Sequence, residues 1–306
     1  MAAITGESAT PAASAAAASE PGLPGRAGQA ESAAPDAGAV YALGSNPGES
    51  ARLQRQSEEL RPESVALLDW IGLKRGQSAI DVGCGPSGIL GLMSAAVSPG
   101  GRVVGLDADP AHVALAREYA SRHGMANVEV AAADARHTGL PSGTFDLVHA
   151  RTLLATVPGP AGVLAEMMRL AKPGGWVASQ EPDMEYSLCY PPLPAWDRIG
   201  ELFRASFGRS GADPCIGHRL TELYRQAGLE EIAAVVHAAT YPAGHSRRTI
   251  LPDLVRSLGP MIVELGLAGQ SELAELDRAV REHLADPATL VLPHLLFVVR
   301  GRKPAG

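Results

Sequence analysis

Short apolar runs alternate with amphipathic segments through the middle of the chain, and this alternation predicts the fold. The runs with the composition of buried strands cover residues 78–82, 102–107, 128–134, 145–150 and 176–180. Between them, apolar residues recur at every third or fourth position, which predicts helices over 110–122 and 160–171. Strands that alternate with helices indicate an α/β fold with a doubly wound, mostly parallel sheet and right-handed crossovers.

The C-terminal third continues this alternation and adds helices. Residues 232–236 predict a sixth strand, and the runs 290–292 and 295–299 together predict the last strand of a seven-stranded sheet. Residues 248–285 contain two amphipathic helices that a doubly wound sheet does not require. We expect this segment, about 246–286, to form a lid over the ligand-binding end of the sheet. Packing without a further role, or a surface for a homodimer, stays open as the alternative.

The N-terminal residues have a different composition. Residues 1–38 are dominated by Ala, Gly, Pro, Ser and Glu, with no large apolar side chain after Leu23, so they cannot bury enough area to offset the entropy of ordering. We expect a disordered tail there, followed by helices over 39–74. Residues 75–183 would then form the ligand-binding core, and 184–306 the remaining strands with the helical insertion.

Composition and charge narrow the class of protein. The chain has 306 residues and a formal net charge of −7, which argues against a nucleic-acid-binding surface because such a surface requires a basic stripe. The three cysteines are scattered and form no C-x-x-C pair, which favours a reducing, cytoplasmic location. No apolar run reaches the ~18 residues of a membrane span, and the N-terminus lacks the pattern of a signal peptide. We expect a cytoplasmic protein whose partner is a small molecule, with no nucleic acid and no membrane.

Candidate chemistry begins at the turn after the first strand. The run 78–82 breaks into three glycines, Gly83, Gly85 and Gly88, in the spacing G-x-G-x-x-G, and a helical pattern follows. Such a turn lets a nucleotide-like ligand approach the backbone closely. A dinucleotide site has the same glycines, but Asp81, two residues before the first of them, would repel a pyrophosphate and suits a ligand with a cationic end. A purely structural turn is the alternative.

Further charged residues follow the other predicted strands. Asp107, Asp134, Arg151 and Glu181 lie at or just past strand ends, where an open parallel sheet binds its ligands. Asp107 lies 22 residues beyond Gly85 (107 − 85), the usual place of an acid that binds ribose hydroxyls, in a dinucleotide site as well. Taken singly, each has the alternative of an ordinary capping or turn residue. Together and in this order, they predict one ligand site at the carboxyl end of the sheet.

The segment 81–88, Asp-Val-Gly-Cys-Gly-Pro-Ser-Gly, resembles the first motif of class I S-adenosylmethionine-dependent methyltransferases, although its third glycine comes one position later than in their commonest form. Residues 170–175 are similar to their Leu-Lys-Pro-Gly-Gly turn before strand five. The segment from Tyr41, followed by Glu-x-x-Arg-Leu-x-x-Gln, resembles bacterial small-molecule methyltransferases in which a leading helix closes over the cofactor. The resemblance covers residues 41–182 well, and it implies a Rossmann-like methyltransferase fold with S-adenosyl-L-methionine as cofactor.

This resemblance implies a set of cofactor-binding residues, which are Tyr41, Arg52, Gln56, Asp81, Gly83, Gly85, Asp107, Asp134, Ala135 and Arg151. By the same resemblance, Tyr41 would lie near the sulfonium, and Arg52 and Gln56 near the methionyl carboxylate. Asp107 would bind the ribose hydroxyls, and Asp134 would pair with the adenine amino group. A solvated polar helix is the alternative for the segment that carries Arg52 and Gln56.

Methyl transfer is an in-line displacement, and it requires a general base only when the acceptor must lose a proton. The ionisable candidates at the ligand end of the sheet are Glu181, Asp183, Tyr190, Tyr241 and His245. We take Glu181 and His245, together with Tyr41, as the candidate catalytic residues, with a binding or capping role as the alternative for each. A cluster of flat side chains between Pro182 and Trp196 predicts either an apolar acceptor pocket or part of the core.

The sequence therefore predicts an enzyme of secondary metabolism that methylates a small, natural-product-like acceptor. The acceptor atom stays open between the carbon of an electron-rich ring such as indole, a nitrogen and an oxygen. Two other functions also stay open: an NAD(P)-dependent oxidoreductase that uses the same glycines, and a non-catalytic S-adenosylmethionine-binding regulatory protein. We expect no metal, because the sequence has no His-Glu-x-x-His and its nine histidines are dispersed.

Overall fold

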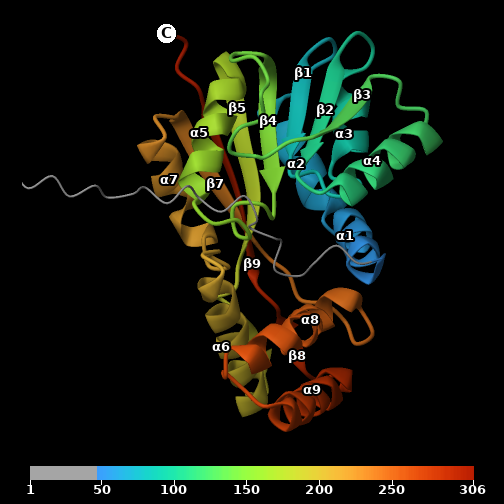
Figure 1. Cartoon of the computed structure of the whole chain (residues 1–306), viewed down its shortest axis with the longest axis vertical. Helices are drawn as coiled ribbons and strands as arrows, with labels where there is room; N and C mark the ends of the chain where they lie inside the picture. Colours follow the sequence, from blue (N-terminus) through green and yellow to red (C-terminus); the bar gives the residue numbers. More distant parts are fainter. Residues whose placement is uncertain (1–46) are drawn as a thin grey trace, which may run out of the picture. The chain divides into compact units, whose positions relative to one another are not determined.

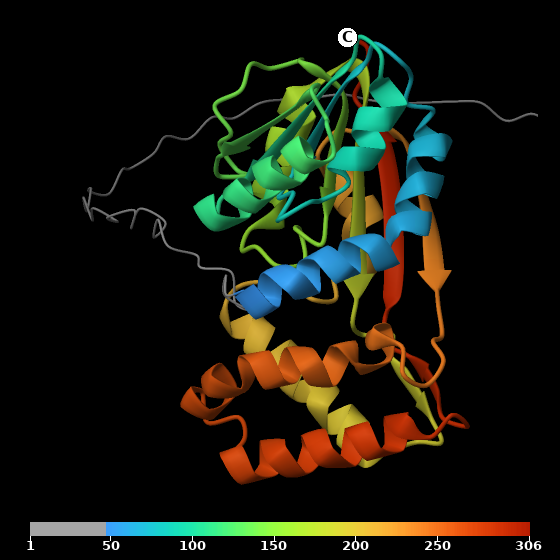
Figure 2. The same ribbon diagram turned by 90° about the vertical axis from the view of Figure 1, so that its right-hand side faces the viewer.

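The computed structural model describes residues 47–306 (Figures 1 and 2). The tail predicted over 1–38 and the candidate residue Tyr41 lie outside the described residues. Within the described part, a sheet with helices on both faces adjoins a further group of helices. Over residues 47–306, no helix has both the length and the apolar character that crossing a membrane requires.

Seven strands of the described chain form one sheet, in the order β3-β2-β1-β4-β5-β9-β7. Their bounds are β1 Ser78–Val82, β2 Arg102–Asp107, β3 Val128–Ala132, β4 Phe145–Arg151, β5 Ala171–Asp183, β7 Glu230–Ala238 and β9 Leu295–Arg302. Strands β1 to β5 are parallel, whereas β9 runs antiparallel to both β5 and β7. The predicted mostly parallel, seven-stranded α/β sheet is confirmed. Its strand order reverses between β1 and β4, the place where such sheets bind ligands.

Helices cover both faces of this sheet because successive strand residues point to opposite sides and both sets are apolar. The helices of this part are α1 Pro47–Glu59, α2 Arg61–Ile71, α3 Leu90–Val97, α4 Pro110–Arg122, α5 Pro160–Leu170 and α7 Leu220–Gln226. One cluster of buried side chains joins α2, α3 and α4 to the face that includes Ala79 of β1. A second cluster joins α5 and α7 to the opposite face, which includes Ile80.

Several strand ends differ from their predicted positions, among them those of β3 and β5. Strand β3 ends at Ala132, before Asp134, which forms an isolated β-bridge with His137 in the following loop. Strand β5 begins earlier than predicted, at Ala171, because this residue already pairs with Phe145 of β4. The first difference matters for function, since it places Asp134 on a loop instead of at a strand tip.

Most of the remaining helices form a group that we call the helical module. It consists of β6 Leu188–Tyr190, α6 Pro194–Arg209, η2 Ser246–Thr249, α8 Ile250–Glu264, α9 Gln270–Ala285 and β8 Leu290–Leu292. The short helix η1 Gly217–Arg219 lies outside this group and contacts α7, β5 and β9. Trp196 of α6, Leu251 of α8 and Val280 of α9 share one buried cluster. The two amphipathic helices predicted over 248–285 are thus present as α8 and α9. Figure 2 shows them beyond the end of the sheet at which α1 lies.

One strand prediction is wrong. The run 290–292 does not continue into β9, but forms β8, which pairs antiparallel with β6 in a separate two-stranded sheet. Pro293 and His294 separate β8 from β9, and a proline cannot donate to a continuous ladder. The sequence pattern did not predict β6, because a strand of three residues is too short to show a period.

Candidate active site

Strand β1 leads into a turn whose three glycines all have left-handed backbone. The angle φ is +70° at Gly83, +57° at Gly85 and +50° at Gly88, a region that other residues seldom adopt. A side chain at Gly88 would place its Cβ 2.1 Å from Oδ2 of Asp81, so the turn packs directly onto that carboxylate. At Gly85, by contrast, a Cβ would meet no atom within 4 Å. The backbone at Gly85 is therefore open to a ligand.

Asp81 lies beneath this turn, with 1% of its surface exposed. Its Oδ2 accepts a hydrogen bond from the N–H of Ile89 at the start of α3 (3.0 Å), and its Oδ1 lies 2.8 Å from Nδ1 of His149. His149 is fully buried and is the register partner of Asp81 on β4. Both oxygens of Asp81 are thus engaged inside the protein, and a direct contact between Asp81 and a ligand stays a prediction.

Asp107 ends β2 and contacts the same turn from the side. Its Oδ2 accepts a hydrogen bond from the N–H of Gly85 (2.8 Å), and its Oδ1 accepts one from the N–H of Asp109 (2.9 Å). A hydrogen bond with Asp107 raises the pKa of His112, whose Nδ1 lies 3.5 Å from Oδ1. The Asp107 side chain keeps 13% exposure, so part of its carboxylate stays accessible beside the open part of the turn.

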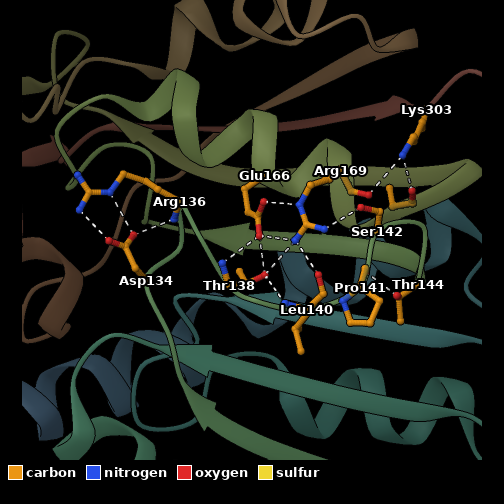
Figure 3. A network of polar contacts seen from close by, with 11 residues as sticks. Asp134, Arg136, Thr138, Leu140, Pro141, Ser142, Thr144, Glu166, Arg169 and Lys303 are labelled. Atoms are coloured by element: carbon orange, nitrogen blue, oxygen red, sulfur yellow. Dashed lines mark hydrogen bonds and ion pairs between the residues drawn. The ribbon is translucent and has the colours of Figure 1, made fainter.

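Asp134 lies in the loop between β3 and β4 (Figure 3). It accepts hydrogen bonds from the backbone N–H of Arg136 (2.8 Å) and from Nε (3.1 Å) and Nη2 (2.8 Å) of the same residue. These bonds to Arg136 lower the pKa of the Asp134 carboxyl. Its side chain is 48% exposed, while Ala135 packs against the core. The loop therefore presents an ionised, accessible carboxylate just after β3, the neighbour in the sheet of the strand β2 that Asp107 ends.

A charged pair on α5 anchors this loop (Figure 3). Glu166 accepts hydrogen bonds from the N–H of Thr138 (2.9 Å) and from its hydroxyl, and Arg169 donates to both oxygens of Glu166. Arg169 also donates to the carbonyl of Leu140 (2.8 Å). Chiefly through the bond from Arg169, the pKa of Glu166 is lowered to about 2. Charge-assisted hydrogen bonds thus fix the loop of Asp134 to the helix.

Two of the predicted cofactor-binding residues lie on α1. Arg52 pairs with Glu49 (Nη2 to Oε1, 2.6 Å) and donates to Oε1 of Gln56 (2.8 Å). Gln56 in turn donates to the hydroxyl of Thr152, just after β4, over 3.4 Å. The chain of contacts joins α1 to the end of the sheet.

Arg151, the last residue of β4, makes a second connection to the leading helices. Its guanidinium donates to the hydroxyls of Ser64 on α2 (3.1 Å) and Ser57 on α1 (2.9 Å). It also donates to the carbonyl of Gly88 in the glycine turn (3.4 Å). Arg151 therefore holds the turn and both leading helices together, and a direct contact with the cofactor stays a prediction.

Glu181, the first candidate base, is fully buried. Its Oε1 accepts hydrogen bonds from the N–H groups of Leu153 (3.1 Å) and Leu154 (3.0 Å), and its Oε2 accepts one from the N–H of Ala155 (3.1 Å). Burial raises the pKa of this carboxyl to about 7. The geometry assigns Glu181 to holding the turn after β4, and it lends no support to a role as general base.

The other candidate bases also have ordinary contacts. Nδ1 of His245 accepts a hydrogen bond from the N–H of Arg247 (3.1 Å) at the start of η2, and its ring stacks on Tyr241 with centroids 4.7 Å apart. Asp183 is fully buried, and Tyr190 is 64% exposed. Within the described residues, none of these candidates lines the pocket at the end of the sheet.

That pocket lies where the carboxyl end of the sheet meets the helical module. Its apolar wall includes Leu60, Phe203, Phe207, Ile250, Leu254 and Leu296. Its polar side chains are Arg52, Gln56, Thr152, Thr156, Arg247 and His294. Of the proline and aromatic residues that were predicted to line a pocket, Pro182 lines this one, whereas Trp196 is buried in the helical module. Sequence reasoning missed Arg247 and His294, which have no recognisable motif.

Comparison with known proteins gives the family. A family model described as a methyltransferase domain matches residues 73–227, which is 155 of the 306 residues (227 − 73 + 1). Over 126 residues the chain is 37% identical to Nocamycin O-methyltransferase of Saccharothrix syringae. The matched region covers 41% of this chain and 45% of that protein. The chain spans about half the length of the first curated relatives that it matches.

Solved structures agree on the fold. A putative methyltransferase from Bacillus halodurans superposes with a TM-score of 0.55 at 19% identity, over 79% of this chain and 99% of that one. Phosphoethanolamine N-methyltransferase 2 of Haemonchus contortus, in complex with phosphomonomethylethanolamine and S-adenosylhomocysteine, superposes with a TM-score of 0.52 at 17% identity, over 79% and 52% of the two chains.

The fold is that of class I S-adenosylmethionine-dependent methyltransferases, as predicted. The family model matches half of the chain, and the chain therefore belongs to the methyltransferase domain family, whose cofactor is S-adenosylmethionine. The predicted family is thereby confirmed, and the oxidoreductase alternative loses its support.

The residues around the turn fit this cofactor. Asp107 ends β2, and Asp134 lies in the loop after the neighbouring β3. Both keep an accessible carboxylate that can accept hydrogen bonds from hydroxyl and amino groups. An acid in the position of Asp107 suits ribose hydroxyls and would repel a phosphate on the ribose, such as the 2′-phosphate of NADPH. Arg151 contacts the turn but is directed to the hydroxyls of the leading helices. The accessible acceptors therefore suit the ribose and the adenine of S-adenosylmethionine.

Proposed function

We propose that this chain transfers the methyl group of S-adenosylmethionine to a small, largely apolar acceptor of the natural-product type. One observation carries the proposal, namely that the glycine turn and the pocket are joined by consecutive residues. Arg151 donates to the carbonyl of Gly88 in the turn, and Thr152 lines the pocket. A donor on the turn and an acceptor in the pocket would therefore be neighbours.

The chain offers residues for each part of the cofactor. Asp107 would accept hydrogen bonds from the ribose hydroxyls beside Gly85, and Asp134 would accept one from the adenine amino group. Arg52 and Gln56 would face the methionyl carboxylate from α1. When bound, S-adenosylmethionine supplies a methyl carbon made electrophilic by its sulfonium.

The contribution of the protein to the reaction is alignment and the exclusion of water. Phe203 and Phe207 of α6 and Leu254 of α8 give the pocket an apolar wall on the side of the helical module. In this position the module would serve as the lid expected over 246–286. Holding two reactants in line can account for about 7–11 kcal/mol of a barrier, and an apolar enclosure keeps water from the reacting atoms.

The proposal extends to the setting of the reaction. The similarity to an enzyme named as a nocamycin O-methyltransferase supports a role in secondary metabolism. It also supports a small molecule as the partner, in the cytoplasm, where S-adenosylmethionine would be available.

A labelling experiment tests the proposed function. The full chain is incubated with methyl-labelled S-adenosylmethionine and small-molecule metabolite extracts, and the products are analysed by mass spectrometry. We expect label on a small molecule with the wild-type chain and a strong loss of label with Asp107→Asn. A chain that binds S-adenosylhomocysteine but labels no small molecule in any extract would support the regulatory alternative instead.

A further inference from the structure

Two buried side chains in the pocket form a pair of hydrogen-bond donors. Arg247 is 3% exposed, His294 is 9% exposed, and both line the pocket. Nη2 of Arg247 lies 2.9 Å from Nε2 of His294. A guanidinium can only donate, so Nε2 is the acceptor and Nδ1 of His294 carries the proton. Burial, with the charge of Arg247 beside it, lowers the pKa of His294 to about 3, so the ring stays neutral at physiological pH.

Both side chains hold buried nitrogen atoms without a partner. Within residues 47–306, neither Nδ1 of His294 nor Nε of Arg247 has a hydrogen-bond acceptor. The carboxylate of Glu59 approaches Arg247, but its Oε2 lies 3.9 Å from Nε, too far for a hydrogen bond. The hydroxyl of Ser246 also donates to Glu59. A buried donor without a partner costs about 1–3 kcal/mol, so a ligand with acceptor oxygens would be favoured here.

The charged side chains of the pocket also favour a ligand with acceptor oxygens. Among the described residues no acidic side chain lines it, whereas Arg52 and Arg247 both do. Arg52 is already paired with Glu49, and Arg247 lies within ion-pair distance of Glu59, with 3.9 Å between Nε and Oε2. The Arg247 guanidinium lies in a wall shared with Ile250 and other apolar side chains, and opposite charges attract more strongly in such surroundings than in water. A cationic amine would be repelled at this end of the pocket.

We infer that the acceptor carries an anionic oxygen group, such as a carboxylate, which binds to Arg247 and His294 at one end of the apolar pocket. This inference rests on the proposed function, because it describes the acceptor of the same reaction. It also narrows the range of acceptors left open by the sequence, since an apolar acid fits the pocket and an apolar ammonium does not.

Two probes of nearly the same shape test the inference. Binding of 2-naphthoate and of its neutral amide, 2-naphthamide, is measured by calorimetry at pH 7 on the full chain saturated with S-adenosylhomocysteine. Saturation keeps the probes out of the cofactor site. A charge-assisted bond to Arg247 is expected to make the Kd of the naphthoate about tenfold lower than that of the amide. Equal affinities, or tighter binding of 2-naphthylmethylammonium, would overturn the inference.

Variants test whether the preference for naphthoate over naphthamide depends on Arg247. Arg247→Gln is expected to bring the two Kd values within about twofold of each other, and Arg247→Lys to keep part of the difference because it keeps the charge. Arg256→Gln removes an arginine from the exposed side of α8, where the side chain is 60% exposed, and should leave the ratio unchanged. Should Arg247→Gln not fold, His294→Leu takes its place, with an expected loss of about threefold in naphthoate affinity. An unchanged ratio in the folded variant contradicts the assigned site.

The two proposals fail in different ways. A chain that binds S-adenosylhomocysteine and shows no preference for naphthoate keeps the proposed function and loses the inference. A chain that does not bind S-adenosylhomocysteine loses the proposed function, and the inference falls with it.

Discussion

The acids at or after the ends of the first three strands have different surroundings, and these separate their roles. Asp81 is buried and bound to His149, so it supports the glycine turn from beneath. Asp107 holds the same turn through Gly85 and stays partly accessible. Asp134 is about half exposed and held in place by its neighbours in the loop. Asp107 and Asp134 are therefore the acids best placed to meet a ligand.

Replacing Asp107 by Asn should weaken cofactor binding and leave the fold intact. The amide keeps an oxygen for the N–H of Gly85, but it loses the acceptor for the N–H of Asp109 and the negative charge toward the ribose hydroxyls. Hydrogen bonds to a charged group contribute ~1.5–3 kcal/mol, which corresponds to roughly a 10- to 150-fold higher Kd. Titration with S-adenosylhomocysteine measures this change, with exposed Asp69→Asn as the control. An unchanged Kd would remove the ribose assignment.

Glu181 should make stability depend on pH. Burial raises its pKa from the usual 4.5 to about 7, so the folded chain favours the protonated carboxyl. Its contribution is complete below about pH 4.5 and is lost as the pH rises through 7, by about 3 kcal/mol for a shift of this size. Denaturant unfolding of wild type and Glu181→Gln at pH 5 and pH 8 tests this. The wild type should lose stability relative to the variant at pH 8, and parallel pH profiles would contradict the assignment.

The positions of Asp81 and Asp107 near strand ends were sufficient to predict that both lie at the carboxyl end of the sheet. They could not predict the role of His149, which depends on the register between β1 and β4. The contact between Arg247 and His294 was also not predictable, because the two residues are 47 positions apart in sequence and meet only through tertiary packing. Buried partners of this kind carry no local pattern.

At the level of elements, the loop after β3 depends on α5 for its position. Glu166→Gln should lower the free energy of unfolding by about 1–2 kcal/mol at pH 7, because it weakens the bonds to Arg169 and Thr138. The pKa of Glu166 is lowered to about 2, so this contribution is present above pH 4.5 and fades as the pH falls toward 2.

Chemical denaturation of wild type and Glu166→Gln at pH 7 and pH 3 measures both effects. Glu118→Gln, which removes an exposed ion pair with Arg122, is the matched control and should change stability by less than about 0.5 kcal/mol. A difference between wild type and Glu166→Gln that grows at pH 3 would contradict the account of this anchor.

Elements with a clear period or a clear cap were predictable from sequence. The strand over 102–107 and the helix over 110–122 have their predicted bounds, the latter because Asp109 caps its first turn. Strands β6 and β8 are three residues long, and their pairing depends on a partner about one hundred residues away. Which strand a short apolar run joins is decided by tertiary packing.

On the scale of the whole described chain, the alternation of strands and helices determined the sheet but not the placement of the helical module. Amphipathic helices specify that one face is buried, and not which element buries it. In the structure α6, α8 and α9 bury their faces against one another. Side chains of α6 and α8 then line the pocket together with those of α1, and this arrangement assigns the module to acceptor binding in the proposed function.

Titration calorimetry of the full chain with S-adenosylhomocysteine and with NADPH tests most directly whether the acid-bounded glycine turn binds an adenosyl ligand without phosphate. We predict saturable binding of S-adenosylhomocysteine, weakened in Asp107→Asn, and no binding of NADPH, because Asp107 would repel the 2′-phosphate on its ribose. Saturable binding of NADPH without binding of S-adenosylhomocysteine would contradict this assignment of the site.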